Sequence, residues 1–335
     1  MTRQATPVTL VTGFLGAGKT TLLKHLLQSS LGLKLGVVVN DFGAINIDAE
    51  LIREVQGETQ TVRLTNGCIC CSIRGDLLET VVQLTAQPDP PQHIIVEASG
   101  VSDPLQLVQT FRLSELAPIT RLDGVIAVAD AAGLLDTLEG ESAELASRQI
   151  AAADLVVMNK IDLVSQAQRA AVEAATERLA PDARVLEARY CSVPVEVLLD
   201  TRVHPRTGEG CNRLSAKAGA CGPGHDHHTT YEAFSWEHAA AIDANELRKA
   251  LDRLPPAVLR AKGFVYVVQA PGERTVLHTV GRRSSLTRGG PWLEPPCTQL
   301  VFIGMAKPGL REQVRALLDS AITEDVSARD ARQRE

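Results

Sequence analysis

A glycine-rich segment near the N-terminus has the residue types of a phosphate-binding loop. Residues 13–20 have the sequence Gly-Phe-Leu-Gly-Ala-Gly-Lys-Thr, which fits the pattern G-x-x-x-x-G-K-[ST]. Glycines let backbone N–H groups curl round phosphate oxygens, and the start of a helix adds partial positive charge. We expect Lys19 to reach the β- and γ-phosphate oxygens, and the Thr20 hydroxyl to bind Mg²⁺. The residues of this loop expected to contact a nucleotide are Gly13, Leu15, Gly16, Ala17, Gly18, Lys19, Thr20 and Thr21.

A second polar motif, Asn159-Lys160-Ile161-Asp162, follows a buried strand-like run at 154–158. A carboxylate at Asp162 can accept hydrogen bonds from N1–H and the exocyclic amine of guanine, a donor pair that adenine lacks. The Asn159 side chain can fix the loop and reach the base edge. A solvated turn is the alternative, because turns after strands often hold Asn and Asp. At this distance after a phosphate-binding loop, the motif with its Lys160 predicts guanine.

An acidic residue lies between these two motifs, at the end of the strand-like run His93–Glu97. GTPases commonly hold Mg²⁺ through water at this place, and a glycine N–H three residues later senses the γ-phosphate. These roles are expected for Glu97 and Gly100, so the expected catalytic residues are Lys19, Thr20 and Glu97. An exposed, structural Glu97 is the alternative.

Three cysteines, Cys68, Cys70 and Cys71, lie within four positions. Three thiolates so close can share one soft or borderline cation such as Zn²⁺. Three protein ligands leave one coordination position open, which suits a site that passes its metal on. A redox pair of Cys70 and Cys71 and an inert buried cluster are the alternatives.

A histidine tract further along the chain, His225, His227 and His228, is a second candidate for loose metal binding. A solvated polar loop is the alternative for this tract. His25 falls on the polar side of the first predicted helix and is expected to be solvated.

Short apolar runs alternate with helical patterns from Val8 to about Ala188, which predicts an α/β fold with a mostly parallel sheet. The predicted strands are Val8–Thr12, Leu35–Val39, Gln60–Leu64, His93–Glu97, Gly124–Ala129 and Asp154–Met158. The predicted helices are Thr20–Gln28, Arg74–Thr85 and Gln166–Leu179. The phosphate-binding pattern therefore lies between a strand and a helix, the context that it requires.

A break in the pattern separates two predicted domains. The nucleotide-binding domain is placed at residues 1–200, and residues 201–230, rich in Gly and Pro, are interpreted as a flexible linker. A smaller α+β domain follows at 231–322, and a charged tail at 323–335. The elements predicted in the smaller domain are strands Glu232–Trp236, Phe264–Ala270, Val276–Val280 and Leu300–Gly304, and helices Asp243–Leu254 and Leu310–Ile322.

Composition narrows the class of protein. The length of 335 residues favours two domains. A net charge of −6 and an aromatic content of 3% argue against a nucleic-acid partner. No apolar run approaches the roughly 20 residues of a membrane helix, and no signal-peptide core precedes the first strand. A cytoplasmic location without a membrane partner is expected, in which cysteines stay reduced.

Taken together, these residues resemble the CobW-type GTPases, a metal-handling branch of the P-loop proteins that has Glu in the Mg²⁺-sensing motif. The resemblance covers about Val8 to Ile322. The matching segments are Gly13–Thr20, Asn40-Asp41-Phe42-Gly43, Gly67–Cys71, Glu97–Gly100 and Asn159–Asp162, with Leu259–Phe264 and Leu300–Gly304 in the smaller domain.

The resemblance implies a chaperone for zinc, or for cobalt, that couples GTP hydrolysis to metal delivery to an apo-metalloprotein acceptor. It implies that the cysteine triplet holds the cargo metal and that Asp41 joins Thr20 and Glu97 around Mg²⁺. Many relatives carry a Glu where this chain has Ala44, so a metal ligand is missing there. The rival interpretations are a nucleotide-regulated metal sensor, a cobalt-handling GTPase of cobalamin or metalloenzyme maturation, and a P-loop kinase with structural zinc. An oligomer is compatible with each.

Overall fold

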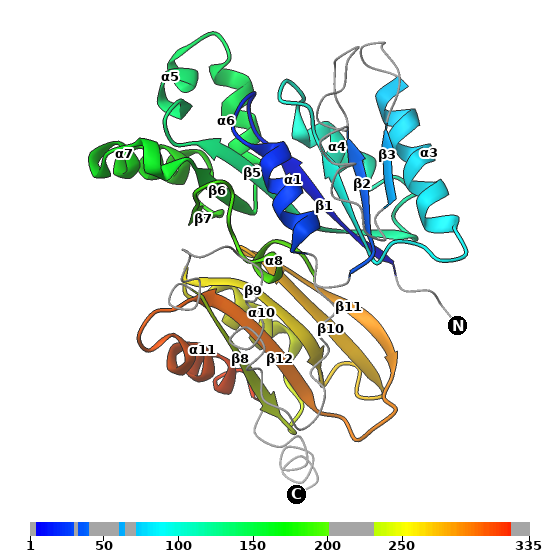
Figure 1. Cartoon of the computed structure of the whole chain (residues 1–335). Coiled ribbons are helices and arrows are strands. Elements are labelled where there is room, and N and C mark those ends of the chain that lie inside the picture. Colours follow the sequence, from blue (N-terminus) through cyan, green and yellow to red (C-terminus); the bar gives the residue numbers. More distant parts are fainter. Residues whose placement is uncertain (1–4, 30–32, 40–59, 64–71, 201–230, 323–335) are drawn as a thin grey trace, which may run out of the picture. The chain divides into compact units, whose positions relative to one another are not determined.

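The computed structural model describes residues 5–29, 33–39, 60–63, 72–200 and 231–322 (Figure 1). The chain divides into two compact units, Met1–Thr201 and Arg202–Glu335. The predicted linker at 201–230 and the predicted tail at 323–335 lie outside the described residues, so their character stays a prediction. Among the described helices, none is long and apolar enough to cross a membrane.

A parallel sheet of seven strands forms the centre of the first unit, in the order β3-β2-β4-β1-β5-β6-β7. The strands are β1 Thr6–Thr12, β2 Leu35–Val39, β3 Gln60–Arg63, β4 His93–Glu97, β5 Thr120–Asp130, β6 Leu155–Asn159 and β7 Arg184–Glu187. Every residue of β1, β2, β4 and β6 is buried, so both faces of the sheet are covered at its centre. This arrangement confirms the predicted α/β class.

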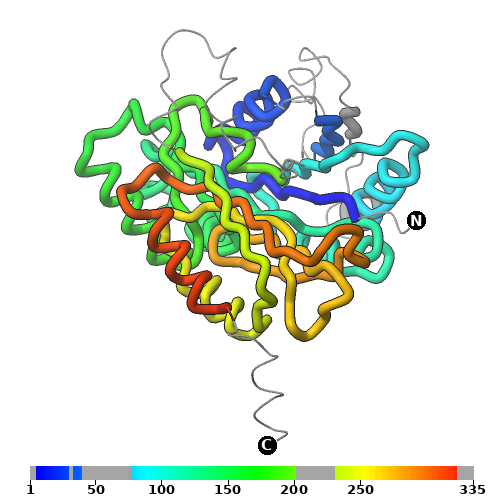
Figure 2. The backbone as a smooth tube through the Cα atoms, turned by 90° about the horizontal axis from the view of Figure 1, so that it is seen from below, coloured from blue at the N-terminus to red at the C-terminus, as the bar shows by residue number. Residues whose placement is uncertain are grey.

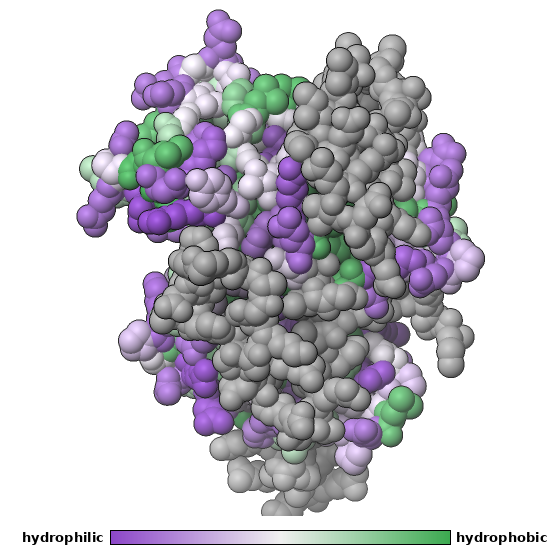
Figure 3. All heavy atoms as spheres, viewed as in Figure 1, coloured by the Kyte–Doolittle hydropathy of each residue, from purple (hydrophilic) through white to green (hydrophobic). Residues whose placement is uncertain are grey.

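Helices connect the parallel strands of the first unit. They are α1 Lys19–Gln28, α3 Ser72–Ala86, α4 Pro104–Thr110, α5 Leu134–Glu139, α6 Ala143–Ala151, α7 Gln166–Leu179 and α8 Val195–Leu198, with a short 3₁₀ helix η1 at Ile161–Leu163. One apolar cluster joins α3 and α4 to β1, β2 and β4, and another joins α5, α6 and α7 to β5 and β6. The exposed residues of α7 are polar residues and alanines, and Figure 3 shows hydrophilic and hydrophobic residues mixed on the left of the view.

Side-chain caps help to explain where two predicted helices begin. The Ser165 hydroxyl accepts from the N–H of Gln168, whose side chain bonds back to the N–H of Ser165. In the second unit, the Asp243 carboxylate accepts from two N–H groups at the start of its helix, and these bonds lower the pKa of that carboxyl. Both helices begin within one residue of the predicted start.

The second unit is an antiparallel sheet of five strands in the order β11-β10-β9-β12-β8. Its elements are β8 Tyr231–His238, α10 Ala244–Asp252, β9 Val258–Val265, β10 Glu273–Val280, β11 Arg283–Pro291, β12 Thr298–Met305 and α11 Leu310–Asp319. Apolar side chains of α10 and α11 share one core with the sheet, around Trp236 and Phe302. Figure 2 shows the two helices side by side under the strands. The predicted α+β class of this unit is confirmed.

One predicted strand of the second unit is wrong. The apolar run Phe264–Ala270 reads as a strand, yet β9 spans Val258–Val265, and Val267 makes only an isolated bridge. Gly263 lies inside β9 with φ +152°, where a Cβ would collide with the Gln299 carbonyl of β12. Because polar and glycine residues occupy the middle of β9, a search for apolar runs does not detect this central strand.

Candidate functional site

The phosphate-binding loop links β1 to α1 at the carboxyl edge of the parallel sheet. Gly13 has φ +136°, and a Cβ there would collide with the carbonyl oxygen of Val128 in β5. Gly18 caps α1 with φ +113°. Because L side chains rarely adopt these angles, the glycines at these two positions are required by the backbone path. The first N–H groups of α1 have no partner within their own helix, which suits them to bind anions.

Lys19 places an ammonium group over this loop. Its side chain is buried, and Nζ donates to the carbonyl oxygens of Gly13 at 2.9 Å and Phe14 at 3.1 Å. The charge is therefore held at the mouth of the loop, where it can stabilise phosphate oxygens.

Thr20 and Glu97 meet beside the loop. The Thr20 hydroxyl donates to Glu97 Oε1 at 3.3 Å, and Glu97 ends β4 opposite Val11 of β1. Glu97 is 4% exposed, so the alternative of an exposed strand-end residue is wrong. A hydroxyl and a buried carboxylate are hard oxygen ligands of the kind that Mg²⁺ takes, so this donor set fits the ion.

Asn159 connects the phosphate-binding loop to the segment that follows β7. Its Nδ2 donates to the Ala17 carbonyl at 3.0 Å, and its Oδ1 accepts from the Cys191 N–H at 2.9 Å. Asn159 is 3% exposed, so it is not part of a solvated turn. A Cβ at Gly18 would lie 2.5 Å from Asn159 Nδ2, which shows how closely the two motifs pack.

The remaining residues of the second motif lie on a supported turn. Lys160 has φ 62° and its Nζ pairs with Asp130 Oδ2 at 2.6 Å. Asp162 follows in η1 and is exposed. Its carboxylate is therefore accessible to a ligand, while the backbone beneath it is fixed.

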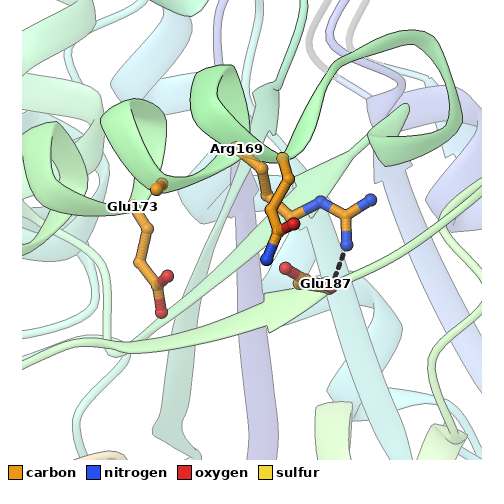
Figure 4. A pocket seen from close by; sticks show the side chains of 5 residues that line it. Arg169, Glu173 and Glu187 are labelled. Carbon is orange, nitrogen blue, oxygen red and sulfur yellow. Dashed lines mark hydrogen bonds and ion pairs between the residues drawn. The ribbon is translucent and has the colours of Figure 1, made fainter.

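Arg169 of α7 contributes to that support. Its Nη2 donates to the Ile161 carbonyl at 3.2 Å, and its Nη1 pairs with Glu187 Oε2 at 3.1 Å (Figure 4). Arg169 and Glu187 line a polar hollow of about 430 Å³ together with Gln166, Ala170 and Glu173. Because Arg169 bonds the carbonyl of the residue before Asp162, we interpret the Arg169 side chain as part of the support for that turn.

Sequence reasoning missed the segment after β7, which carries no recognisable motif. Tyr190 and Cys191 both have positive φ, and Cys191 Sγ donates to the Gly18 carbonyl at 3.3 Å. Burial raises the pKa of the Cys191 thiol to about 12, so this group is a neutral packing residue. The prediction of a solvated His25 was also wrong, since this half-buried ring bonds the Val193 carbonyl at 2.7 Å.

Several predicted site residues lie outside the described residues, so their roles stay predictions. They are Asp41, the triplet Cys68, Cys70 and Cys71, and the tract His225, His227 and His228. Within the described ranges, no group of three or more His, Cys, Asp or Glu side chains is arranged to hold a metal ion.

The fold and the phosphate-binding loop define a P-loop GTPase. Residues 7–187 match the CobW/HypB/UreG nucleotide-binding domain, and residues 231–322 match the cobalamin synthesis protein cobW C-terminal domain. The chain belongs to the CobW/HypB/UreG family.

Relatives with curated names cover nearly the whole chain. A zinc chaperone CobW of Sinorhizobium sp is 32% identical over 93% of this chain and 97% of its own. Zinc chaperone YjiA of Escherichia coli is 30% identical over 92% of this chain and 96% of its own. The zinc-regulated GTPase metalloprotein activator 1 of Dictyostelium discoideum is 30% identical over 86% of this chain and 68% of its own. The crystal structure of zinc-bound YjiA from Escherichia coli matches 96% of this chain and 100% of that chain, at 23% identity and a TM-score of 0.44.

Proposed function

We propose that this chain is a GTP-hydrolysing zinc chaperone that delivers its metal to an apo-metalloprotein. The observation that supports GTP hydrolysis is the convergence of three side chains at one loop. Lys19 and Thr20 begin α1, and the carboxylate of Glu97, at the end of β4, accepts from the Thr20 hydroxyl. The proposed role as a zinc chaperone is supported by relatives at 30–32% identity that are named zinc chaperones.

In this proposal Mg²⁺ is held by Thr20 and Glu97, together with Asp41. The ion supplies positive charge that neutralises the phosphates and the charge that develops during transfer. Lys19 stabilises the same charge from the loop, and the backbone N–H groups at the start of α1 fix the phosphates in place. The residues proposed to bind nucleotide are those of the loop with Gly100, Asn159, Lys160 and Asp162.

Zinc is cargo in this proposal and binds the thiolates of Cys68, Cys70 and Cys71. The order of affinity at such a site places zinc above cobalt, so Co²⁺ is the secondary candidate metal. The histidine tract at 225–228 is proposed as a second, weaker collecting site. The protein is proposed to act in the cytoplasm. Its nucleotide-binding domain is proposed to end at about residue 200, and its second domain to begin at about residue 231.

A second candidate is a zinc-regulated activator that changes its partner without transferring metal. The Dictyostelium discoideum relative, which is named a zinc-regulated GTPase metalloprotein activator, favours this candidate. The two are separated by loading the chain with one equivalent of radioactive zinc, adding an apo-acceptor and GTP, and following the isotope. Isotope in the acceptor supports the chaperone, whereas acceptor activation with the isotope retained supports the activator.

The proposed base specificity gives a prediction at Asp162. GTP is expected to bind at least about tenfold more tightly than ATP, because the carboxylate accepts from two guanine donors. A tenfold difference in affinity corresponds to about 1.4 kcal/mol. Asp162→Asn is expected to reduce that preference and leave the melting temperature unchanged. Isothermal titration of both nucleotides measures the preference for GTP over ATP.

Asp89→Asn is the matched control, since that exposed carboxylate precedes β4 at the opposite edge of the sheet. Equal affinities of the unaltered chain for GTP and ATP would contradict guanine recognition.

A further inference from the structure

A tight turn follows Glu97 and contacts the phosphate-binding loop. The Ser102 N–H donates to the Ser99 carbonyl at 2.9 Å, which closes the turn. At its tip, a Cβ on Gly100 would lie 2.6 Å from Leu15 Cδ2 and 3.0 Å from Leu15 N. The turn therefore packs against the loop at its first central residue, where any larger side chain would have to displace Leu15.

A glutamine from α6 holds this turn from behind. Gln149 is 1% exposed, and its Nε2 donates to the Gly100 carbonyl at 2.9 Å and to the Ser102 carbonyl at 3.2 Å. Both partners are acceptors, so the amide nitrogen must face them. The two bonds hold the peptide between the two central residues of the turn and the peptide that follows the turn.

The other end of the same amide shows that packing alone does not account for this residue. Gln149 Oε1 is buried and, among the described residues, has no hydrogen-bond partner. A buried acceptor without a partner destabilises the fold, whereas a methionine of similar size would fill the space without that cost. The amide is therefore explained by its two donor bonds to the turn.

The same helix also contacts the chain just beyond the turn. Arg148 pairs with Asp103 at 3.2 Å, and Asp103 caps α4. Arg148 is 47% exposed in its side chain, so water screens this pair and it contributes little. The buried amide is the stronger of the two contacts between α6 and the segment 100–103.

We propose that Gln149 is a positioning residue that presents the Gly100 turn to the γ-phosphate of GTP. The inference rests on the proposed function, in which Gly100 senses that phosphate. With the turn held in advance, GTP binding does not have to order it. GDP lacks the γ-phosphate, so its affinity does not depend on the turn. Gln149 is thereby a determinant of the preference for GTP over GDP, although it touches neither nucleotide.

The test uses two variants of the full chain. Gln149→Met keeps the length of the side chain without a donor, and Gln149→Glu keeps its shape but presents an acceptor to two carbonyls. The affinities for a non-hydrolysable GTP analogue and for GDP are measured with Mg²⁺ by isothermal titration. Both variants are expected to lose about tenfold or more in affinity for the analogue, with GDP affinity unchanged within error.

Ile150→Val is the matched control, because this neighbour is buried in the apolar cluster of α6 and does not bond the turn. It is expected to lower the melting temperature by a few degrees without changing the GTP:GDP ratio. A wild-type ratio in a folded Gln149→Met or Gln149→Glu chain would overturn the positioning role. Failure of the unaltered chain to bind the analogue would instead overturn the proposed GTPase function, and the inference with it.

Discussion

Lys19→Ala is expected to reduce GTP hydrolysis by about a hundredfold or more. The ammonium is buried at the mouth of the loop, so it acts where water screens charge weakly. Removing one preorganised donor that faces developing negative charge typically costs a factor of about 10²–10³ in turnover, and we expect a loss of this order here. Phosphate release from GTP with Mg²⁺, measured at saturating nucleotide, gives the factor directly. Affinity for the GTP analogue is expected to fall as well, since Lys19 also binds ground-state phosphates.

Lys24→Ala is the matched control for this variant. Lys24 lies on the same helix, five residues further on, and is half-buried. Its removal is expected to leave turnover unchanged, which separates loss of the phosphate contact from loss of helix stability. Normal turnover in a folded Lys19→Ala chain would contradict the loop as the working site.

A variant in which Cys68, Cys70 and Cys71 are all replaced by serine is expected to lose tight zinc binding. Thiolates are the soft ligands of the proposed site, and a serine hydroxyl is a far weaker zinc ligand. Metal analysis of the purified chain is expected to fall from about one zinc per chain to near zero. Zinc binding to the unaltered chain should release protons, because thiols become thiolates.

Cys297→Ser is the control for that experiment. Cys297 lies in the second unit. The pKa of its thiol is raised, mainly by burial. This substitution is expected to leave the zinc content unchanged. If deleting residues 224–228 removed the zinc while the triple serine variant kept it, the site would lie in the histidine tract.

Spacing along the chain was enough to predict the parts of the site that are local in sequence. The loop at 13–20 follows β1, as predicted, and the Asn159–Asp162 motif begins on the last residue of β6, which ends one residue later than predicted. The partners of these motifs were not predictable in the same way. Cys191 reaches the site from the segment after β7 and Gln149 from α6, and neither residue type signals such a role.

The errors in the fold have a similar physical origin. The apolar pattern predicts β9 too late in the chain because the centre of this strand carries Lys262 and Gly263, and the apolar run that follows leaves the sheet. β11 was missed because it is an edge strand with few apolar residues. Pairing with neighbouring strands, and not local hydrophobicity, decides which of these segments extend the sheet.

The central claim is that nucleotide state and zinc affinity are coupled. Zinc affinity should be measured by competition with a chelating dye, once with a non-hydrolysable GTP analogue and once with GDP. The account predicts that the two affinities differ by about 1–3 kcal/mol, or roughly 5–150-fold, and that zinc shifts the GTP:GDP affinity ratio by the same factor. Identical zinc affinities in the two nucleotide states would contradict a chaperone driven by GTP and leave the cysteine cluster a static site.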